Sequence, residues 1–290
     1  MKELEGTIND IVARLTDETP VKDFYPAQPT RLPSVQAVRD IAELGLQLFF
    51  PGFYTEHRSD NLFNAFNTGS LLFRLSDLLK EQCLLSLCFV CTSDGSGKCL
   101  ECEERALAIV QDFLNALPQV RRLLYSDIRA IYDGDPAAVS YAEIIYCYPA
   151  VRAMLHFRMA HELFLLGIPI LPRLMTELAH QSTGIDIHPG AVIGEALAID
   201  HGTGIVIGET CVIGDHVKLY QGVTLGARSF SLDEHGLPVK GVPRHPIVED
   251  GVVIYANATV LGRITIGKNS TIGGNVWLTQ SVPEGSIIKA

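Results

Sequence analysis

The sequence lacks the features that would place it in a membrane, on nucleic acid or in the secretory pathway. No stretch of its 290 residues reaches the roughly 18 uninterrupted apolar residues of a membrane-spanning helix. There is no block of Lys or Arg, and the net charge of −10 argues against nucleic acid or an anionic membrane surface as the main partner. The N-terminus carries acidic residues and no long apolar core, so it is no signal peptide. We therefore expect a cytoplasmic protein that acts on a small molecule.

What the sequence does have is an aliphatic residue at every sixth position through its C-terminal part. The positions are Ile187, Ile193, Ile199, Ile207, Ile213, Leu219, Val248, Ile254, Val260, Ile266, Ile272 and Leu278. Strands alternate every two residues and helices every three to four, so this period instead indicates a parallel β-helix with three short faces per coil. Asn257, Asn269 and Asn275 fall at the expected turns, where unusual φ values are needed. The pattern predicts a left-handed β-helix of hexapeptide repeats over residues 184–290, the hand being that of the hexapeptide type.

Residues 1–183 contain no such repeat and predict a separate, mostly helical unit, which makes the fold class α+β. Apolar residues at three- and four-residue spacing predict helices over residues 35–49, 62–87, 103–117 and 120–131, and a helical pair over 157–180. We expect Ser59 and Asp60 to cap the second helix. The expected breaks lie at residues 51–52, 94–97, 133–136 and 167–169. The boundary between the two units is expected near Gly184.

Five of the seven cysteines lie between residues 83 and 102. Cys88, Cys91, Cys99 and Cys102 form C-x2-C-x7-C-x2-C, and paired CxxC elements are typical of tetrahedral thiolate zinc sites. The seven-residue separation is shorter than usual for zinc ribbons, and free thiols in a reducing cytoplasm often pack as small core residues. Packing is the preferred interpretation and zinc the alternative, with disulfides disfavoured. Cys147 and Cys211 are expected in the core.

The six-residue period fails at two places. The register slips by two residues after Ile199, and the repeat lapses between Leu225 and Val248, where residues 228–246 are expected to leave the coil as an extruded loop. A regular coil has no concavity of its own, so interruptions of this kind are where such a scaffold builds a site. The polar residues at the two interruptions are Asp200, His201, Arg244 and His245.

His201 is the candidate general base, because a neutral imidazole suits proton removal from an alcohol at neutral pH. Asp186 lies one coil earlier, about one strand spacing of 4.8 Å away, and is the candidate partner that fixes the tautomer of the base. The alternative is that His201 caps a turn while Asp186 bonds a backbone N–H.

These motifs resemble the serine O-acetyltransferase family. The matching runs cover residues 183–194, 199–210, 221–226 and 244–246, in the family's order and, apart from the loop before Arg244, in its spacing. The hexads alone would indicate only the wider acyltransferase superfamily, whereas Asp-His-x-Thr-Gly joined to Arg-His-Pro is much more specific. The resemblance runs from about Asp135 to the end, and the first 110 residues do not match in detail.

The resemblance implies direct transfer of acetyl from acetyl-CoA to the hydroxyl of L-serine, the first step of cysteine biosynthesis, with no acyl-enzyme and no catalytic metal. It makes His201 the base, Asp186 its orienter and His245 a second imidazole at the serine hydroxyl. Arg244 would bind the substrate carboxylate, while Asp135 and Asp200 would hold the ammonium. The alternatives are an N-cap for Asp135 and a plain surface charge for Arg244.

Acetyl-CoA is implied to lie along the coil against small residues. The matching positions are Gly226, Ala227 and Ala256, with Lys268 as the candidate for the phosphates. Ala227 replaces a usual Gly, and Thr271 stands where a basic residue is common.

The resemblance also implies a homotrimer with active sites shared between chains, and favours a hexamer built as a dimer of trimers. It implies feedback inhibition by cysteine, and docking into cysteine synthase through a C-terminal tail ending in Ile. This sequence ends at residues 287–290, almost flush with the last hexad, which leaves that partnership doubtful.

Three other functions stay open. A related acetyltransferase acting on homoserine or a sugar would keep His201 but, for a sugar, would not need Asp135, Asp200 and Arg244. A zinc carbonic anhydrase of this fold would need a His-x4-His pair, which His188, His201 and His216 do not form. A non-catalytic assembly scaffold would not explain the charged residues at the interruptions.

Overall fold

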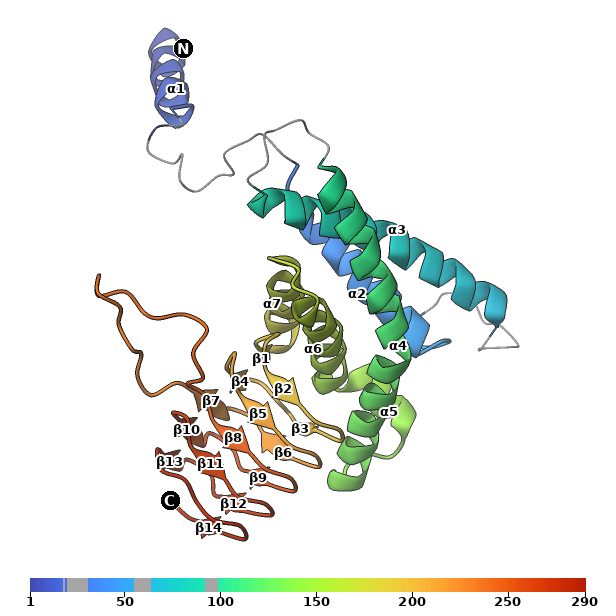
Figure 1. Cartoon of the computed structure of the whole chain (residues 1–290), viewed down its shortest axis with the longest axis vertical. Coiled ribbons are helices and arrows are strands. Elements are labelled where there is room, and N and C mark those ends of the chain that lie inside the picture. The colour runs from blue at the N-terminus through green and yellow to red at the C-terminus, as the bar shows by residue number, and fades with distance from the viewer. Residues whose placement is uncertain (18, 20–30, 55–63, 92–98) are drawn as a thin grey trace.

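The structure is a computed structural model that describes residues 1–17, 19, 31–54, 64–91 and 99–290. Apart from the N-terminal helix, which stands away from the others, its helices gather at one end of a coil of short strands, and the C-terminus lies toward the other end (Figure 1). The helices are α1 (Lys2–Leu15), α2 (Val35–Phe49), α3 (Ala65–Val90), α4 (Leu100–Gly134), α5 (Tyr141–Cys147), α6 (Pro149–Leu165) and α7 (Leu171–Thr183). None of the helices in the described part of the chain combines the length and apolar character needed to span a bilayer.

Side-chain caps begin several of these helices. The Ser34 hydroxyl accepts the N–H of Ala37 at 3.2 Å at the start of α2, whose bounds are those the sequence predicts. Asn64 caps α3, while the predicted caps at residues 59–60 and the predicted break at 94–97 lie outside the described residues. Such caps satisfy backbone donors that a helix leaves unpaired at its N-terminus.

The prediction of two helices over residues 103–131 is wrong, because α4 runs unbroken through Pro118. Proline removes one backbone donor, but the buried face continues through Leu117 and Val120 on either side of it. The burial of this continuous apolar stripe offsets the cost of the proline. The sequence analysis also missed α1 and the seven-residue α5, at whose end Cys147 is exposed rather than in the core.

The strands form three parallel sheets, one for each face of a triangular prism. Sheet A contains β1 (Asp186–Ile187), β4 (Val206–Ile207), β7 (Thr224–Gly226), β10 (Thr259–Leu261) and β13 (Trp277–Leu278). Sheet B contains β2 (Val192–Ile193), β5 (Val212–Ile213), β8 (Ile247–Val248) and β11 (Thr265–Ile266). Sheet C contains β3 (Ala198–Asp200), β6 (Lys218–Tyr220), β9 (Val253–Ile254), β12 (Thr271–Ile272) and β14 (Ile287–Ile288).

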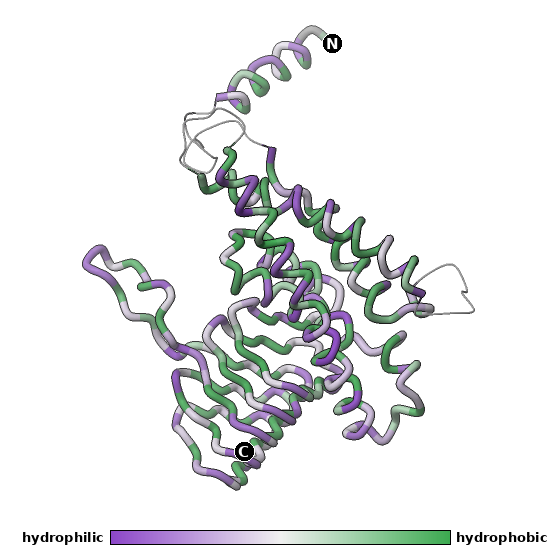
Figure 2. The backbone as a smooth tube through the Cα atoms, turned by 45° about the vertical axis from the view of Figure 1, so that its right-hand side comes forward, coloured by the Kyte–Doolittle hydropathy of each residue, from purple (hydrophilic) through white to green (hydrophobic). Residues whose placement is uncertain are grey.

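This arrangement is a left-handed β-helix of hexapeptide repeats, as the sequence predicts. The aliphatic positions point inward and are buried, apart from the partly buried Leu278. Hydrophobic residues recur along the coils in Figure 2. Asn257, Asn269 and Asn275 have φ values of 61°, 56° and 59°, the left-handed turns for which Asn was expected.

The strand register locates both interruptions. Asp186 pairs with Val206, whereas Val206 pairs with Thr224, so the first coil is two residues longer than the second. Thr224 pairs with Thr259, which makes the coil that carries the loop seventeen residues longer than its predecessor. The extruded loop projects away from the prism between β7 and β8 (Figure 1), and its far tip is hydrophilic (Figure 2).

A buried ion pair joins the helices to the coil. The guanidinium of Arg158 on α6 donates from Nε and Nη2 to the two carboxylate oxygens of Asp127 on α4, at 2.7 and 2.8 Å. Arg158 also donates to the carbonyl of Gly194, and the N–H of Leu197 donates to Asp127. Since Gly194 and Leu197 belong to the first coil, the pair fixes that coil against the helices that carry Asp135.

Candidate active site

His201 lies in the two-residue insertion of the first coil, at the edge between sheets C and A (the C–A edge). The N–H of Gly202 donates to the carbonyl of Asp200 at 2.7 Å, which makes a three-residue turn with His201 at its centre and a φ of 55°. Turns of this kind with positive φ are rare and strained for a residue with a side chain, and such strain clusters at functional sites. The turn leaves the imidazole 78% exposed in the single chain.

Two carboxylates gather beside His201 at the C–A edge. Asp200 places Oδ1 3.7 Å from His201 Nε2, and its Oδ2 lies 3.2 Å from the ammonium of Lys218. Asp135 lines the same small pocket as Asp200, Lys218 and Tyr148. The structure therefore brings together the two residues predicted to bind the substrate ammonium, although Asp135 comes from a helix end and Asp200 from the coil.

Asp135 follows the last turn of α4 and is not an N-cap. Its Oδ2 accepts the hydroxyl of Tyr148 at 2.7 Å, and its Oδ1 accepts the N–H of Ala137 at 2.8 Å. These two hydrogen bonds, that of Tyr148 first, lower the pKa of Asp135. The carboxylate is thus held in place and kept ionised, as an ammonium ligand must be.

Asp186 lies on β1, where its N–H donates to the carbonyl of Ile205 four residues after His201. Among the described residues, its Oδ1 lies 3.2 Å from Nη1 of Arg173 on α7, and it makes no contact with the imidazole of His201. Arg173 also pairs with Glu177 on the same helix. A contact between Asp186 and His201 would therefore require a change of side-chain rotamers.

His245 lies at the edge between sheets A and B (the A–B edge), where its ring packs against the backbone of Gly208. A Cβ on Gly208 would be 2.0 Å from Cδ2 and 2.2 Å from Nε2 of the imidazole, so the ring rests on the glycine backbone. The N–H of Thr210 donates to His245 Nδ1 at 3.1 Å. Nδ1 is therefore the acceptor, and in the neutral ring Nε2 carries the hydrogen.

Burial lowers the pKa of His245 to about 4, and the positive charge of Arg244 adds to the shift. The imidazole is therefore neutral at physiological pH and offers the Nε2–H group as a hydrogen-bond donor. The hydroxyl of Thr210 accepts the backbone N–H groups of Arg244 and His245, at 2.9 and 3.1 Å, and so ties the end of the extruded loop to the coil.

Arg244 is half-buried and is positioned by Glu209. Its Nη2 lies 2.7 Å from Oε2 of Glu209, and its Nη1 donates to the carbonyl of Val242 at 3.3 Å. Arg263 reinforces the same edge by donating to the carbonyls of Thr210 and His245. The guanidinium of Arg244 is thereby held at a fixed angle, which suits it to a carboxylate ligand.

Within one chain these two groups of residues lie on opposite edges of sheet A. His201 connects β3 to β4, whereas His245 contacts Thr210 between β4 and β5. One face of about six residues spans up to about 20 Å, several times the length of an amino-acid ligand. A single small substrate cannot contact His201 and His245 of the same chain.

The four residues predicted to bind acetyl-CoA are not brought together in one chain. Gly226 and Ala227 lie at the A–B edge, Ala256 lies at the C–A edge, and Lys268 lies between β11 and β12 at the third edge. The ammonium of Lys268 is also 3.0 Å from Oδ2 of Asp250. Lys268 is thus already paired.

Sequence reasoning missed the residues that hold the predicted ones in place. These are Tyr148, Arg173, Glu209, Thr210, Lys218 and Arg263. One regular coil has eighteen residues, so counting eighteen onward from Asp200 and from His245 finds Lys218 and Arg263 in the next coil. Tyr148 and Arg173 come from helices whose packing no repeat reveals.

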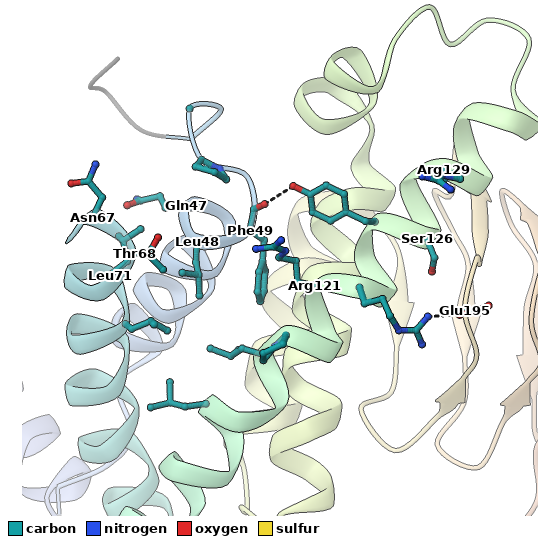
Figure 3. A pocket seen from close by; sticks show the side chains of 18 of the residues that line it. Gln47, Leu48, Phe49, Asn67, Thr68, Leu71, Arg121, Ser126, Arg129 and Glu195 are labelled. Carbon is teal, nitrogen blue, oxygen red and sulfur yellow. Dashed lines mark hydrogen bonds and ion pairs between the residues drawn. The ribbon is translucent and has the colours of Figure 1, made fainter. Parts of the chain in front are cut away.

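A cavity of about 1290 Å³ lies elsewhere, between α2, α3 and α4 (Figure 3). Arg121, Arg129 and the Arg122–Glu195 ion pair are among the groups around it. Among the described residues that line it, none is one of the predicted serine or acetyl-CoA ligands. The residues predicted to bind serine thus lie at the edges of sheet A and not at this cavity.

Comparison with known proteins extends the similarity to serine acetyltransferases from the part after Asp135 to nearly the whole chain. The family model "Bacterial transferase hexapeptide (six repeats)" matches residues 245–280. The relative named "Serine acetyltransferase, plasmid", from Synechococcus elongatus, is 46% identical over 291 residues, which cover 98% of this chain and 90% of the relative.

Two solved structures extend the comparison to three dimensions. Serine acetyltransferase isoform 3 from Entamoeba histolytica, in complex with cysteine, is 37% identical with a TM-score of 0.73, over 90% of this chain and 82% of that one. The soybean serine acetyltransferase complexed with serine is 30% identical with a TM-score of 0.56, over 87% and 90% of the two chains.

Proposed function

Because the chain belongs to the serine acetyltransferase family, we propose that the residues at the two edges of sheet A are the two halves of one active site. The chain is an acetyltransferase that transfers acetyl from acetyl-CoA to the hydroxyl of serine. The observation that supports the two-half arrangement is the placement of His201 and His245 on opposite edges of one face. The C–A edge of one chain therefore faces the A–B edge of its neighbour in a homotrimer.

In this proposal His201 is the general base. Its imidazole removes the proton of the serine hydroxyl as the oxygen attacks the thioester carbonyl of acetyl-CoA. The tetrahedral intermediate then collapses, the C–S bond breaks, and the imidazolium returns the proton to the departing thiolate. Serine binding and trimer closure draw Asp186 from Arg173 toward His201, where the carboxylate stabilises the imidazolium.

The remaining polar residues hold the zwitterionic substrate. Asp135 and Asp200 bind the ammonium, and Arg244 of the neighbouring chain binds the carboxylate through the N–H groups that Glu209 does not occupy. Lys218 neutralises part of the negative charge of Asp200. The substrate ammonium is therefore bound by Asp135 together with a partly neutralised Asp200, and not by two free carboxylates. His245 donates its Nε2–H to the serine hydroxyl and sets its direction of attack.

Acetyl-CoA is proposed to lie in the groove between neighbouring prisms, against Gly226 and Ala227 of one chain and Ala256 of the other. Lys268 reaches the phosphates only by exchanging its ion pair with Asp250. Each chemical step is assigned to a side chain, so the mechanism requires no catalytic metal. The proposed place of action is the cytoplasm, where acetyl-CoA is available; pairing of trimers into a hexamer is a further proposal that concerns the helices.

Release of thiol from acetyl-CoA, measured with L-serine, L-homoserine and a panel of sugars, tests the substrate directly. Sugars should react poorly, because Arg244 needs a carboxylate and Asp135 needs an ammonium. Homoserine offers both groups, but its extra methylene displaces the hydroxyl from His201, so serine should give the highest kcat/KM. A sugar accepted as well as serine would contradict the assignment of Asp135, Asp200 and Arg244.

A further inference from the structure

Three cysteine thiols meet where the C-terminal end of α3 adjoins the N-terminal end of α4, and a fourth, that of Cys88, lies beside one of them. Cys88 lies in the last turn of α3, Cys91 and Cys99 are the residues that cap α3 and α4, and Cys102 lies in the first turn of α4. The Sγ atoms of Cys91, Cys99 and Cys102 all lie within 4.8 Å of one another. Cys88 and Cys102 are within hydrogen-bonding reach of each other.

The spacing of these sulfur atoms matches a bound ion better than a disulfide. Cys91 Sγ and Cys99 Sγ are 3.9 Å apart. Four sulfurs at about 2.3 Å from a tetrahedral ion lie about 3.8 Å from each other, whereas a disulfide needs about 2.05 Å.

We propose that Cys88, Cys91, Cys99 and Cys102 form a structural zinc site that joins the end of α3 to the start of α4. Zinc is favoured among divalent ions because it accepts four thiolates in a closed tetrahedron. The positive N-terminal end of α4 lies beside Cys99 and Cys102 and stabilises the negative charge of the cluster.

The alternatives explain less of the geometry. Cys83 is fully buried, whereas Cys88, Cys91 and Cys99 are only partly buried and pack at the margin of the core. Packing alone does not require Cys91, Cys99 and Cys102 to place their sulfur atoms within 4.8 Å of one another. Convergence of three thiols at a helix junction, with the thiol of Cys88 close enough to complete a tetrahedron, is the arrangement that a metal ion stabilises.

The first test is metal analysis of the full-length protein, purified with reductant and without chelator. We expect about one zinc per chain. A mercurial reagent that modifies thiols should release that zinc to a chromogenic chelator. Zinc far below one per chain, iron in its place, or two disulfides detected by mass spectrometry would each overturn the proposal.

Variants then locate the ion. Cys91→Ser and Cys99→Ser should each lose most of the zinc and lower the melting temperature by several degrees. The matched control is Cys147→Ser, an exposed cysteine outside the cluster, which should keep one zinc per chain. If the cluster variants do not fold, Co²⁺ substitution in the wild-type chain decides: the intense visible bands of tetrahedral thiolate cobalt support the site, and an octahedral spectrum contradicts it.

Discussion

The imidazole of His245 rests directly on the backbone of Gly208, where a Cβ would lie 2.0 Å from the ring. This contact fixes the ring plane while the N–H of Thr210 fixes the tautomer. His245 is thus held by the coil itself, although it belongs to the end of the extruded loop. The orientation of His245, at the end of the extruded loop, therefore depends on Gly208, a small residue in the regular part of the coil.

Replacing Gly208 by Ala should displace the ring and lower kcat/KM for serine by about tenfold or more, since a misplacement of about 1 Å can cost up to about 100-fold. Steady-state kinetics measure the effect. Gly69→Ala is the control, because a Cβ at Gly69 meets nothing within 4 Å. Unchanged kinetics in Gly208→Ala would show that the position of His245 does not matter.

Removing the hydroxyl that holds Asp135 should weaken serine binding alone. Tyr148→Phe leaves the carboxylate without its 2.7 Å donor, so the KM for serine should rise several-fold while the KM for acetyl-CoA stays constant. Tyr132→Phe is the matched control, because it removes a tyrosine hydroxyl from the last turn of α4, just before Asp135. Equal changes in both KM values would argue against Asp135 as an ammonium ligand.

Stability should fall as pH is lowered from about 6.5 to 4. Burial lowers the pKa of His156 to about 4, and that of His245 likewise. In this window the unfolded chain binds protons that the folded chain does not. Each histidine therefore lowers the free energy of unfolding by up to about 1.4 kcal/mol for each pH unit of acidification. Melting temperatures of the wild type, His156→Gln and the exposed control His235→Gln test this across the pH range. Only His156→Gln should reduce the pH dependence, of which the share due to His245 remains.

Breaking the buried pair between Asp127 and Arg158 should destabilise the whole chain. Asp127→Asn leaves an uncompensated guanidinium between α4, α6 and the first coil, which costs about 3–5 kcal/mol. The partly exposed pair of Glu43 and Arg152 provides the control, because Glu43→Gln should have a much smaller effect. If chemical denaturation showed the same loss in the free energy of unfolding for Asp127→Asn and Glu43→Gln, the role given to the buried pair would be contradicted.

The coil could be predicted from the sequence because each inward position must be aliphatic for the next coil to stack on it. The two-residue slip likewise located the turn of His201, since extra residues in a strict repeat have to leave it. Helix boundaries were harder to predict. The sequence predicts two helices where α4 is continuous across Pro118. The burial that offsets the cost of this proline comes from packing that the sequence does not display.

The supporting residues of the site could not be predicted in the same way. Tyr148 and Arg173 reach the coil only because α4, α6 and α7 are fixed against it, partly through Asp127 and Arg158. The division of the chain near Gly184 stays a prediction, because buried apolar residues of the helices and the coil form one continuous core.

The central claim is that one serine site takes His201 from one chain and His245 from the next. Co-expression of differently tagged His201→Ala and His245→Ala chains, followed by purification of the mixed oligomers, tests it most directly. Each variant alone should be nearly inactive, whereas the purified mixed trimers should show about a third of the wild-type activity, because one of the three sites in any trimer that contains both chains has both histidines. Mixed oligomers no more active than the two parents would contradict the claim.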